Sequence, residues 1–276
     1  MKITKAMENE IEAKRLRIAA IGKEKSGKSR LAATGRKPVL FLDTDQRRDS
    51  VAGIKDVFAI TYADPPWPKQ PEGFPEMLDT LTALERGATV GQLIEGSKDE
   101  RTPATVVLDS VSTTSNLIMS YELYSNKDLR REVSIGGKMT VFFPKSFDAW
   151  NAEMKTMESL VLRLLGLPMD VICIFHEAAE EAPDSTEEHP RYTGKVTPFP
   201  ARHGRLLKYF NEVWRVERAG QIPTVQLAPN FFFTAATTLL VDRVEKPDIS
   251  DLIRLHTEKM RQKEEPNQTA KLKGIS

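Results

Sequence analysis

Two glycines five residues apart, followed at once by a lysine and a serine, strongly limit the folds open to this chain. The motif runs from Gly22 to Ser29 (GKEKSGKS) and follows an apolar run at 15–21. Glycines let backbone N–H groups turn inward around an anion, and a helix that begins here adds its positive end. The pattern therefore predicts a phosphate-binding loop between a buried strand and a helix that begins at 29–34. The alternative is a flexible basic loop.

The same motif predicts the ligand. In such a loop Lys28 would reach the β and γ phosphates of a nucleoside triphosphate, and the Ser29 hydroxyl would hold Mg²⁺. We therefore expect ATP and Mg²⁺ as ligands, contacted by Gly22, Lys23, Glu24, Lys25, Ser26, Gly27, Lys28, Ser29 and Arg30.

Short apolar runs alternate with segments of helical spacing along the rest of the chain. This alternation is typical of an α/β fold with a mostly parallel central sheet, flanked by helices. Two later runs are expected to close the sheet as antiparallel strands on its C-terminal side. A polar extension at 1–14 and a charged, flexible tail at 258–276 would flank one domain at 15–257. The expected strands are 15–21, 39–42, 57–62, 105–108, 171–175, 212–216 and 224–227, and the later helices are 74–84 and 154–165.

Composition excludes several classes of protein. The formal net charge is +1, so bulk charge gives no reason to expect nucleic acid. The single cysteine, Cys173, cannot form an internal disulfide. The N-terminal residues lack an apolar signal core, and no apolar run is long enough to span a bilayer. These observations predict a cytoplasmic protein without a membrane segment.

Acidic residues and a histidine follow three of the predicted strands. Asp109 ends the strand at 105–108, where a carboxylate beside the phosphate loop would orient Mg²⁺. Asp43 and Asp45 end the strand at 39–42 and are expected to face the same side, so that one could act on the attacking water. His176 could contact the γ phosphate. The predicted catalytic residues are Lys28, Asp45, Asp109 and His176, and the predicted metal ligands are Ser29 and Asp109. The alternative for Asp109 is an ordinary strand end, and for Asp43 and Asp45 it is a helix cap or a solvated loop. The alternative for His176 is a structural histidine.

These blocks together resemble the RecA-type ATPases, most closely the small RecA-like annealing or recombination ATPases of bacteriophages. The resemblance rests on GKEKSGKS, on VLFLDTD at 39–45 and on VVLDSV at 106–111, with VICIFH at 171–176 as a further block. It implies a RecA-like core, ATP hydrolysis between neighbouring subunits of a ring or filament, and binding to single-stranded DNA. Asp45 stands where the family has a catalytic glutamate, and the 14 residues before the first strand leave little room for the oligomerisation domain of the bacterial recombinase.

Charge changes sign after the strand at 171–175. Residues 177–188 hold six acids, whereas 189–210 hold five basic residues, no acid and several aromatic residues. Phosphate neutralisation and base stacking could act together there. A second basic segment with glycines spans 127–145, and a solvated charged loop is the alternative. The predicted DNA-binding residues are Arg191, Lys195, Arg202, Arg205 and Lys208.

Three functions fit the sequence. The leading hypothesis is an ATP-driven RecA-like protein that acts on single-stranded DNA in phage-type recombination, annealing or replication. The second is a nucleotide-dependent switch or assembly factor that binds a protein partner without DNA. The third is a small-molecule kinase, for which the basic residues at 189–210 would form a lid over the phosphates.

Overall fold

The computed structural model describes residues 15–66, 69–136, 139–181, 192–220, 222–227, 237, 243–245 and 247–254. The predicted extension at 1–14 and tail at 258–276 lie outside these residues, as does Arg191.

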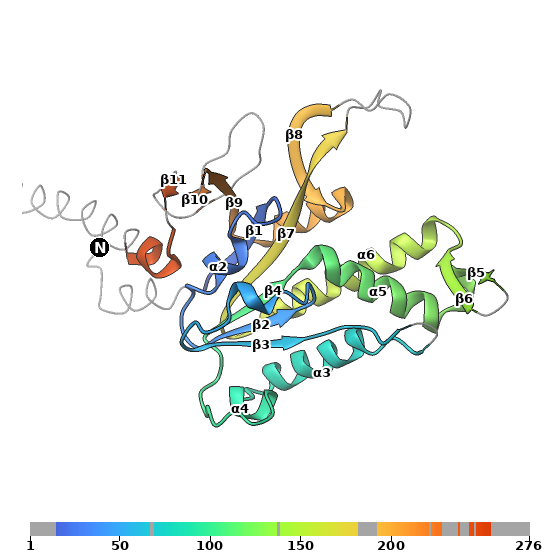
Figure 1. Cartoon of the computed structure of the whole chain (residues 1–276), viewed down its shortest axis with the longest axis horizontal. Helices are drawn as coiled ribbons and strands as arrows, with labels where there is room; N and C mark the ends of the chain where they lie inside the picture. The colour runs from blue at the N-terminus through green and yellow to red at the C-terminus, as the bar shows by residue number, and fades with distance from the viewer. Residues whose placement is uncertain are drawn as a thin grey trace, which may run out of the picture.

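The described residues form one large, mostly parallel sheet, which confirms the predicted fold class (Figure 1). Its order is β11-β10-β9-β1-β7-β4-β2-β3, and β8 pairs with the outer half of β7. Six neighbouring strands are parallel, from β9 to β3 in that order. The parallel strands are β1 (Arg17–Gly22), β2 (Val39–Asp43), β3 (Val57–Thr61), β4 (Thr105–Asp109), β7 (Asp170–Glu181) and β9 (Glu212–Ala219); β8 (Tyr192–Phe199), β10 (Ile222–Gln226) and β11 (Arg243–Glu245) are antiparallel to their neighbours.

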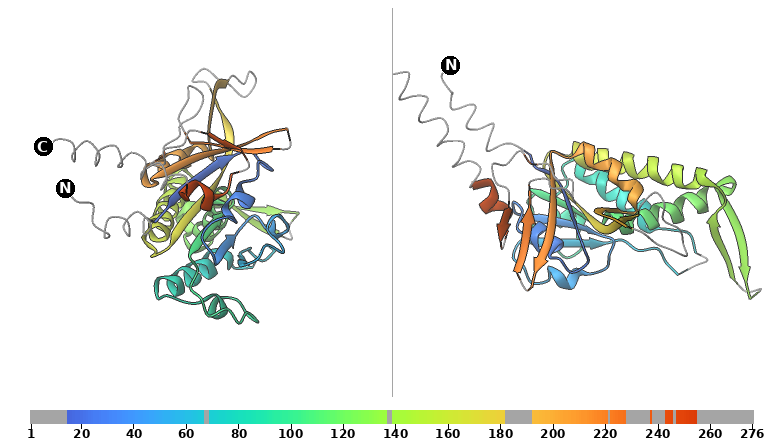
Figure 2. Two further views of the ribbon diagram at one scale, coloured as in Figure 1. Left: turned by 90° about the vertical axis from the view of Figure 1, so that its left-hand side faces the viewer. Right: turned by 90° about the horizontal axis from the view of Figure 1, so that it is seen from above.

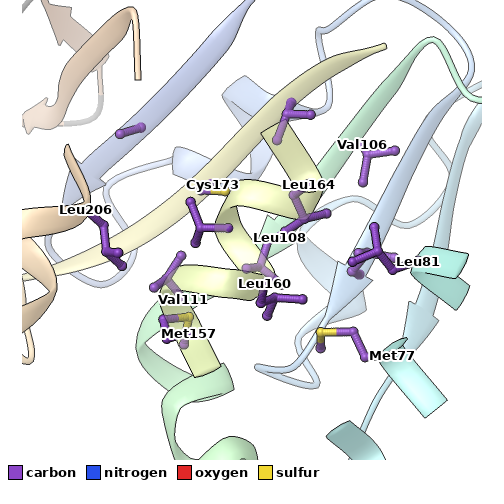
Figure 3. Close-up of a cluster of buried hydrophobic side chains, with 14 of the residues drawn as sticks. Met77, Leu81, Val106, Leu108, Val111, Met157, Leu160, Leu164, Cys173 and Leu206 are labelled. Carbon is purple, nitrogen blue, oxygen red and sulfur yellow. The ribbon is translucent and has the colours of Figure 1, made fainter. Parts of the chain in front are cut away.

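Alternating side chains of the central strands pack into two separate cores. In β1, Ala19 and Ile21 face a core completed by three helices, α3 (Gly73–Glu85), α5 (Val111–Ser125) and α6 (Phe147–Gly166). Figure 3 shows this core, where Met77 and Leu81 of α3 and Leu160 of α6 approach the strands. Ile18 and Ala20 face the opposite core, which α2 (Lys28–Ala32) and residues 249–252 cover.

Three elements differ from the sequence expectation. Strand β9 pairs in parallel with β1 on one edge and antiparallel with β10 on the other. The parallel pairing is possible because the 3₁₀ helix η3 (Ala201–Tyr209) connects β8 to β9. Strand β7 continues past His176 to Glu181 and forms a hairpin with β8, so the segment after this strand is not simply a loop. Helix α6 begins at Phe147, seven residues before its predicted start.

Sequence reasoning missed α5 and a separate two-stranded hairpin. α5 is rich in serine and threonine, which disfavour helix interiors, but Ser110 caps it by accepting a hydrogen bond from the Thr113 amide. The hairpin joins β5 (Arg130–Ile135) and β6 (Met139–Pro144). It lies at the end of α5 and α6 far from β9–β11 (Figures 1 and 2). The remaining short elements are α4 (Val90–Leu93), η1 (Arg48–Ser50) and η2 (Lys127–Leu129).

None of the helices formed by the described residues combines the length and apolar character that crossing a membrane requires.

Candidate active site

Backbone geometry explains both glycines of the loop that joins β1 to α2. A Cβ atom on Gly22 would lie 2.2 Å from the carbonyl oxygen of Val216 in β9, so no larger residue fits where the two strands run side by side. Gly27 has a φ of 102°, a value that L-amino acids rarely adopt. The motif is therefore a tightly folded loop at the carboxyl end of a buried parallel strand, as predicted.

The Lys28 side chain folds back over this loop. Its Nζ donates hydrogen bonds of 2.7 Å to the carbonyl oxygens of Gly22 and Lys23. Burial lowers the pKa of Lys28 from 10.5 to about 8, although the carboxylates of Asp109 and Asp45 oppose that change. The ammonium group is thus held at the loop with weakly basic carbonyl partners, which an anionic phosphate could replace.

Ser29 and Asp109 meet at the same end of the sheet. The Ser29 hydroxyl donates a 2.6 Å hydrogen bond to Asp109 Oδ2. Asp109 is 8% exposed, and burial raises its pKa from 3.8 to about 6, against the Ser29 hydrogen bond and the charge of Lys28. Two hard oxygen donors side by side, one of them a poorly solvated carboxylate, suit Mg²⁺, which prefers one or two protein oxygens plus phosphate and water.

Asp45 forms the centre of a second cluster. Its Oδ2 lies 3.0 Å from His176 Nε2, and its Oδ1 accepts hydrogen bonds from Ser110 Oγ at 2.9 Å and from Thr113 Oγ1. Burial alone would raise the pKa of Asp45, but the hydrogen bonds from His176 and Thr113 outweigh it and lower the pKa to about 2. The backbone N–H of His176 also donates to Ser112 Oγ at 3.1 Å. Asp45, just after β2, and His176 of β7 therefore act as one unit.

Asp43 has other hydrogen-bond partners than Asp45, although the two carboxylates lie close enough for the charge of Asp45 to add to the effect of burial in raising the pKa of Asp43. The Asp43 carboxylate accepts a 3.2 Å hydrogen bond from Thr61 Oγ1 of the neighbouring strand β3. Asp43 is the last residue of β2, and the chain turns after it. The alternation of an extended strand therefore no longer applies at Asp45, which leaves Asp45 as the carboxylate beside His176.

A cavity of about 590 Å³ connects these groups. It falls within the range of about 300–1,000 Å³ that is typical of small-molecule sites. The phosphate-binding loop, Asp45, Asp109 and His176 line one part of it. Residues of the α2 region, the η1 region (Arg47 and Ser50), β9, β10 and the segment after β11 line the rest.

The family comparison agrees with this geometry. A model of the AAA domain family matches residues 14–213, which is more than half of the chain. The chain belongs to the AAA domain family. A comparison with curated proteins gives no match. Membership of this family supports nucleotide binding and an ATPase activity for the AAA domain described here.

The basic residues predicted to bind DNA are not all exposed cations in this AAA domain. Arg202 Nε donates a 3.0 Å hydrogen bond to the fully buried Glu153, and His203 lies 3.2 Å from the same carboxylate. Lys208 Nζ is 3.7 Å from Glu158. Arg205 is exposed, and Lys195 lies on β8. Arg202 thus has a structural role that its position in a basic segment did not reveal.

Sequence reasoning also missed residues of the AAA domain site. The hydroxyl groups of Ser110, Ser112 and Thr113 fix Asp45 and His176, although the sequence marks them only as a polar stretch after Asp109. Their arrangement depends on α5 beginning at once after β4. Pro223 and Pro247 line the cavity from far along the chain, and no local motif indicates this.

Proposed function

We propose that the chain is a Mg²⁺-dependent ATPase of the RecA-like type. The observation that carries this proposal is the convergence of two pairs, Ser29 with Asp109 and Asp45 with His176, on one cavity beside Lys28. In this proposal, binding of Mg²⁺ and ATP requires Lys28 and the pair Ser29 and Asp109. Hydrolysis also requires a group that orients the attacking water, which the pair Asp45 and His176 would supply.

Each residue has a role that follows from its surroundings. Lys28 would exchange the carbonyls of Gly22 and Lys23 for phosphate oxygens, which pair better with an ammonium group. Ser29 and Asp109 would hold Mg²⁺, which supplies charge neutralisation at the phosphates. Asp45, ionised at neutral pH, would accept a hydrogen bond from the attacking water and orient it. His176 fixes the Asp45 carboxylate and acts through it as a positioning residue.

Phosphate release from ATP tests this proposal. We expect turnover that requires Mg²⁺ and is lost on addition of a chelator. Lys28→Ala should remove triphosphate binding while leaving the far-ultraviolet circular dichroism unchanged. Wild-type turnover in a folded Lys28→Ala protein would contradict the proposal.

We further propose that the ATPase acts on single-stranded DNA in phage-type recombination, annealing or replication, as a ring or filament of this chain. Support comes from an aromatic–basic surface at the β5–β6 hairpin and the start of α6, formed by Arg131, Phe143, Phe147 and Trp150. Phe147 is 74% exposed, Phe143 is 40% exposed, and the Arg131 guanidinium lies 5.9 Å from the Phe143 ring centre. The Arg202 guanidinium lies 4.4 Å from the Trp150 ring centre, which joins this surface to η3. Exposed rings beside cations favour base stacking with phosphate contact.

Fluorescence anisotropy over a salt series tests the DNA proposal. Arg131→Ala and Arg205→Ala should each flatten the log–log salt dependence by about 0.7 if the residue contacts one phosphate. Arg86→Ala, at an exposed arginine after α3, is the control and should not change the slope. Absence of DNA binding in every nucleotide state would favour the protein-binding switch or assembly factor instead.

A further inference from the structure

A buried hydroxyl group links the end of β2 to the end of β4 beside the proposed active site. It belongs to Thr44, which is 3% exposed and is not among the described residues that line the cavity. We propose that Thr44 is a positioning residue for ATP hydrolysis, which holds the Asp45 carboxylate in place through Ser110. This role rests on the proposed ATPase function and adds a residue that lies outside the nucleotide cavity.

Two backbone amides join the end of β2 to the last residue of β4. The Thr44 N–H donates a 2.7 Å hydrogen bond to the carbonyl oxygen of Asp109, and the Asp45 N–H donates to the same oxygen at 3.2 Å. The main chain therefore sets the spacing between the carboxylate that would orient water and the one that would hold Mg²⁺. These bonds do not fix the direction of the Asp45 side chain, because its rotation is independent of them.

The Thr44 hydroxyl group fixes the backbone of Ser110, the residue that follows β4. Thr44 Oγ1 accepts a 3.1 Å hydrogen bond from the Ser110 N–H. Its own proton has two carbonyl oxygens within reach, that of Ser110 at 3.1 Å and that of Asp109 at 3.2 Å. Ser110 is fully buried, and a buried amide that loses its acceptor costs free energy. The position of Ser110 therefore depends on the Thr44 hydroxyl group.

Ser110 in turn holds the Asp45 carboxylate. Its Oγ donates a 2.9 Å hydrogen bond to Asp45 Oδ1 and accepts one of 3.2 Å from the Thr113 N–H, which caps α5. The Thr113 hydroxyl group donates to the same oxygen of Asp45. Both donors to Asp45 Oδ1 thus lie at the start of α5, where Ser110 sets their place. Through them the Thr44 hydroxyl group directs the other carboxylate oxygen towards His176.

Thr44→Val removes the hydroxyl group with little change in shape, and Thr44→Ser restores it. A misplacement of about 1 Å can cost about a hundredfold in rate, and we expect Thr44→Val to lower kcat for phosphate release about tenfold. Calorimetric affinity for a non-hydrolysable ATP analogue should stay within twofold, because Asp45 does not bind the phosphates. Thr44→Ser should keep kcat within twofold of the wild type.

The matched control is Thr105→Val, at the first residue of β4. Thr105 is also fully buried, and its hydroxyl group donates a 2.8 Å hydrogen bond to the carbonyl oxygen of Arg36. It lies at the end of β4 opposite to Asp109. Thr105→Val should therefore cost stability much as Thr44→Val does, but it should leave kcat within twofold of the wild type.

The histidine that contacts Asp45 gives a measurement that needs no nucleotide. In NMR spectra of the imidazole nitrogens, the His176 resonances report on its 3.0 Å contact with Asp45 Oδ2. We expect Thr44→Val to shift these resonances and Thr44→Ser to restore them. The His203 ring, which lies 3.2 Å from Glu153, is the internal reference and should not change.

The outcomes distinguish the role of Thr44 from the ATPase proposal. Unshifted His176 resonances in Thr44→Val, or a kcat within twofold of the wild type, would overturn the positioning role. An equal loss of kcat in Thr105→Val would overturn it too, because general destabilisation would then explain both variants. Absence of turnover in the wild-type chain would contradict the ATPase proposal, and the histidine spectra would then decide about Thr44. If Thr44→Val does not fold, Thr44→Ala gives the same comparison with room for a water molecule on the Ser110 amide.

Discussion

Asp109 and Asp45 lie at the same end of the sheet, yet neutralising them should shift the stability of the nucleotide-free fold in opposite directions. Asp109→Asn and Asp45→Asn each replace a carboxylate by an amide of nearly the same shape. The difference lies in what surrounds each group. Asp109 is buried with one hydroxyl donor, whereas Asp45 is surrounded by His176 and two hydroxyl donors.

The magnitude for Asp109 follows from its raised pKa. The pKa of Asp109 is about 6 in the folded chain and 3.8 in the unfolded chain. The group therefore stabilises the fold fully below about pH 4, and this contribution is lost as the pH rises through about 6. A difference of about two pH units corresponds to about 3 kcal/mol, at 1.36 kcal/mol per pH unit. At pH 7.5 Asp109→Asn should therefore raise the free energy of unfolding by about 2–3 kcal/mol, because the amide oxygen can still accept the Ser29 hydrogen bond.

The sign reverses for Asp45. Its folded pKa of about 2 lies below the ordinary 3.8, so its contribution is present above about pH 4 and is lost as the pH falls through about 2. The same conversion gives a loss of about 2 kcal/mol for Asp45→Asn at pH 7.5.

Urea unfolding of the nucleotide-free protein at pH 7.5, followed by circular dichroism, measures both effects, and repetition at pH 5 checks their origin. The gain from Asp109→Asn should shrink at pH 5, where the wild-type carboxyl group is largely protonated, while the loss from Asp45→Asn should persist. Added Mg²⁺ and ATP analogue should stabilise the wild type more than Asp109→Asn. If Asp109→Asn is destabilising at pH 7.5, the assignment of Asp109 as a poorly solvated carboxylate is wrong.

Three further predictions concern binding, turnover and folding. Lys28→Ala should weaken binding of ATP analogue and tripolyphosphate alike in calorimetry, and retention of both affinities would contradict the phosphate role. Asp45→Asn should lower kcat for phosphate release about a hundredfold with little change in nucleotide affinity, whereas Asp43→Asn, the neighbouring control, should keep kcat within a few fold; the opposite pattern would exchange their roles. Glu153→Ala should cost about 3–5 kcal/mol in urea unfolding, because it removes a fully buried carboxylate and leaves Arg202, His203 and Ser115 without the group that they contact; a cost below about 1 kcal/mol would contradict this prediction.

Much of the fold and part of the site could be predicted from local patterns. GKEKSGKS predicted the tightly folded loop between β1 and α2 because its geometry depends on glycines at Gly22 and Gly27, and residue type encodes that requirement directly. The strands before Asp45, Asp109 and His176 were visible because buried parallel strands are continuous apolar runs. Carboxyl ends of parallel strands meet at one edge, so the sequence also predicted that these residues would lie near one another.

Contacts between distant segments could be decided only by the tertiary structure. Asp43 and Asp45 have different partners because the chain turns after β2, and Asp45 pairs with a histidine 131 residues away. The sequence indicated that Arg202 is a solvent-exposed cation, whereas in the structure it donates a hydrogen bond to Glu153 of α6. Pro223 and Pro247 reach the cavity because β9 pairs in parallel with β1. Local sequence encodes backbone conformation and burial. The pairing of remote side chains depends instead on the order of the strands and on the connections between them, and no single segment of sequence determines these.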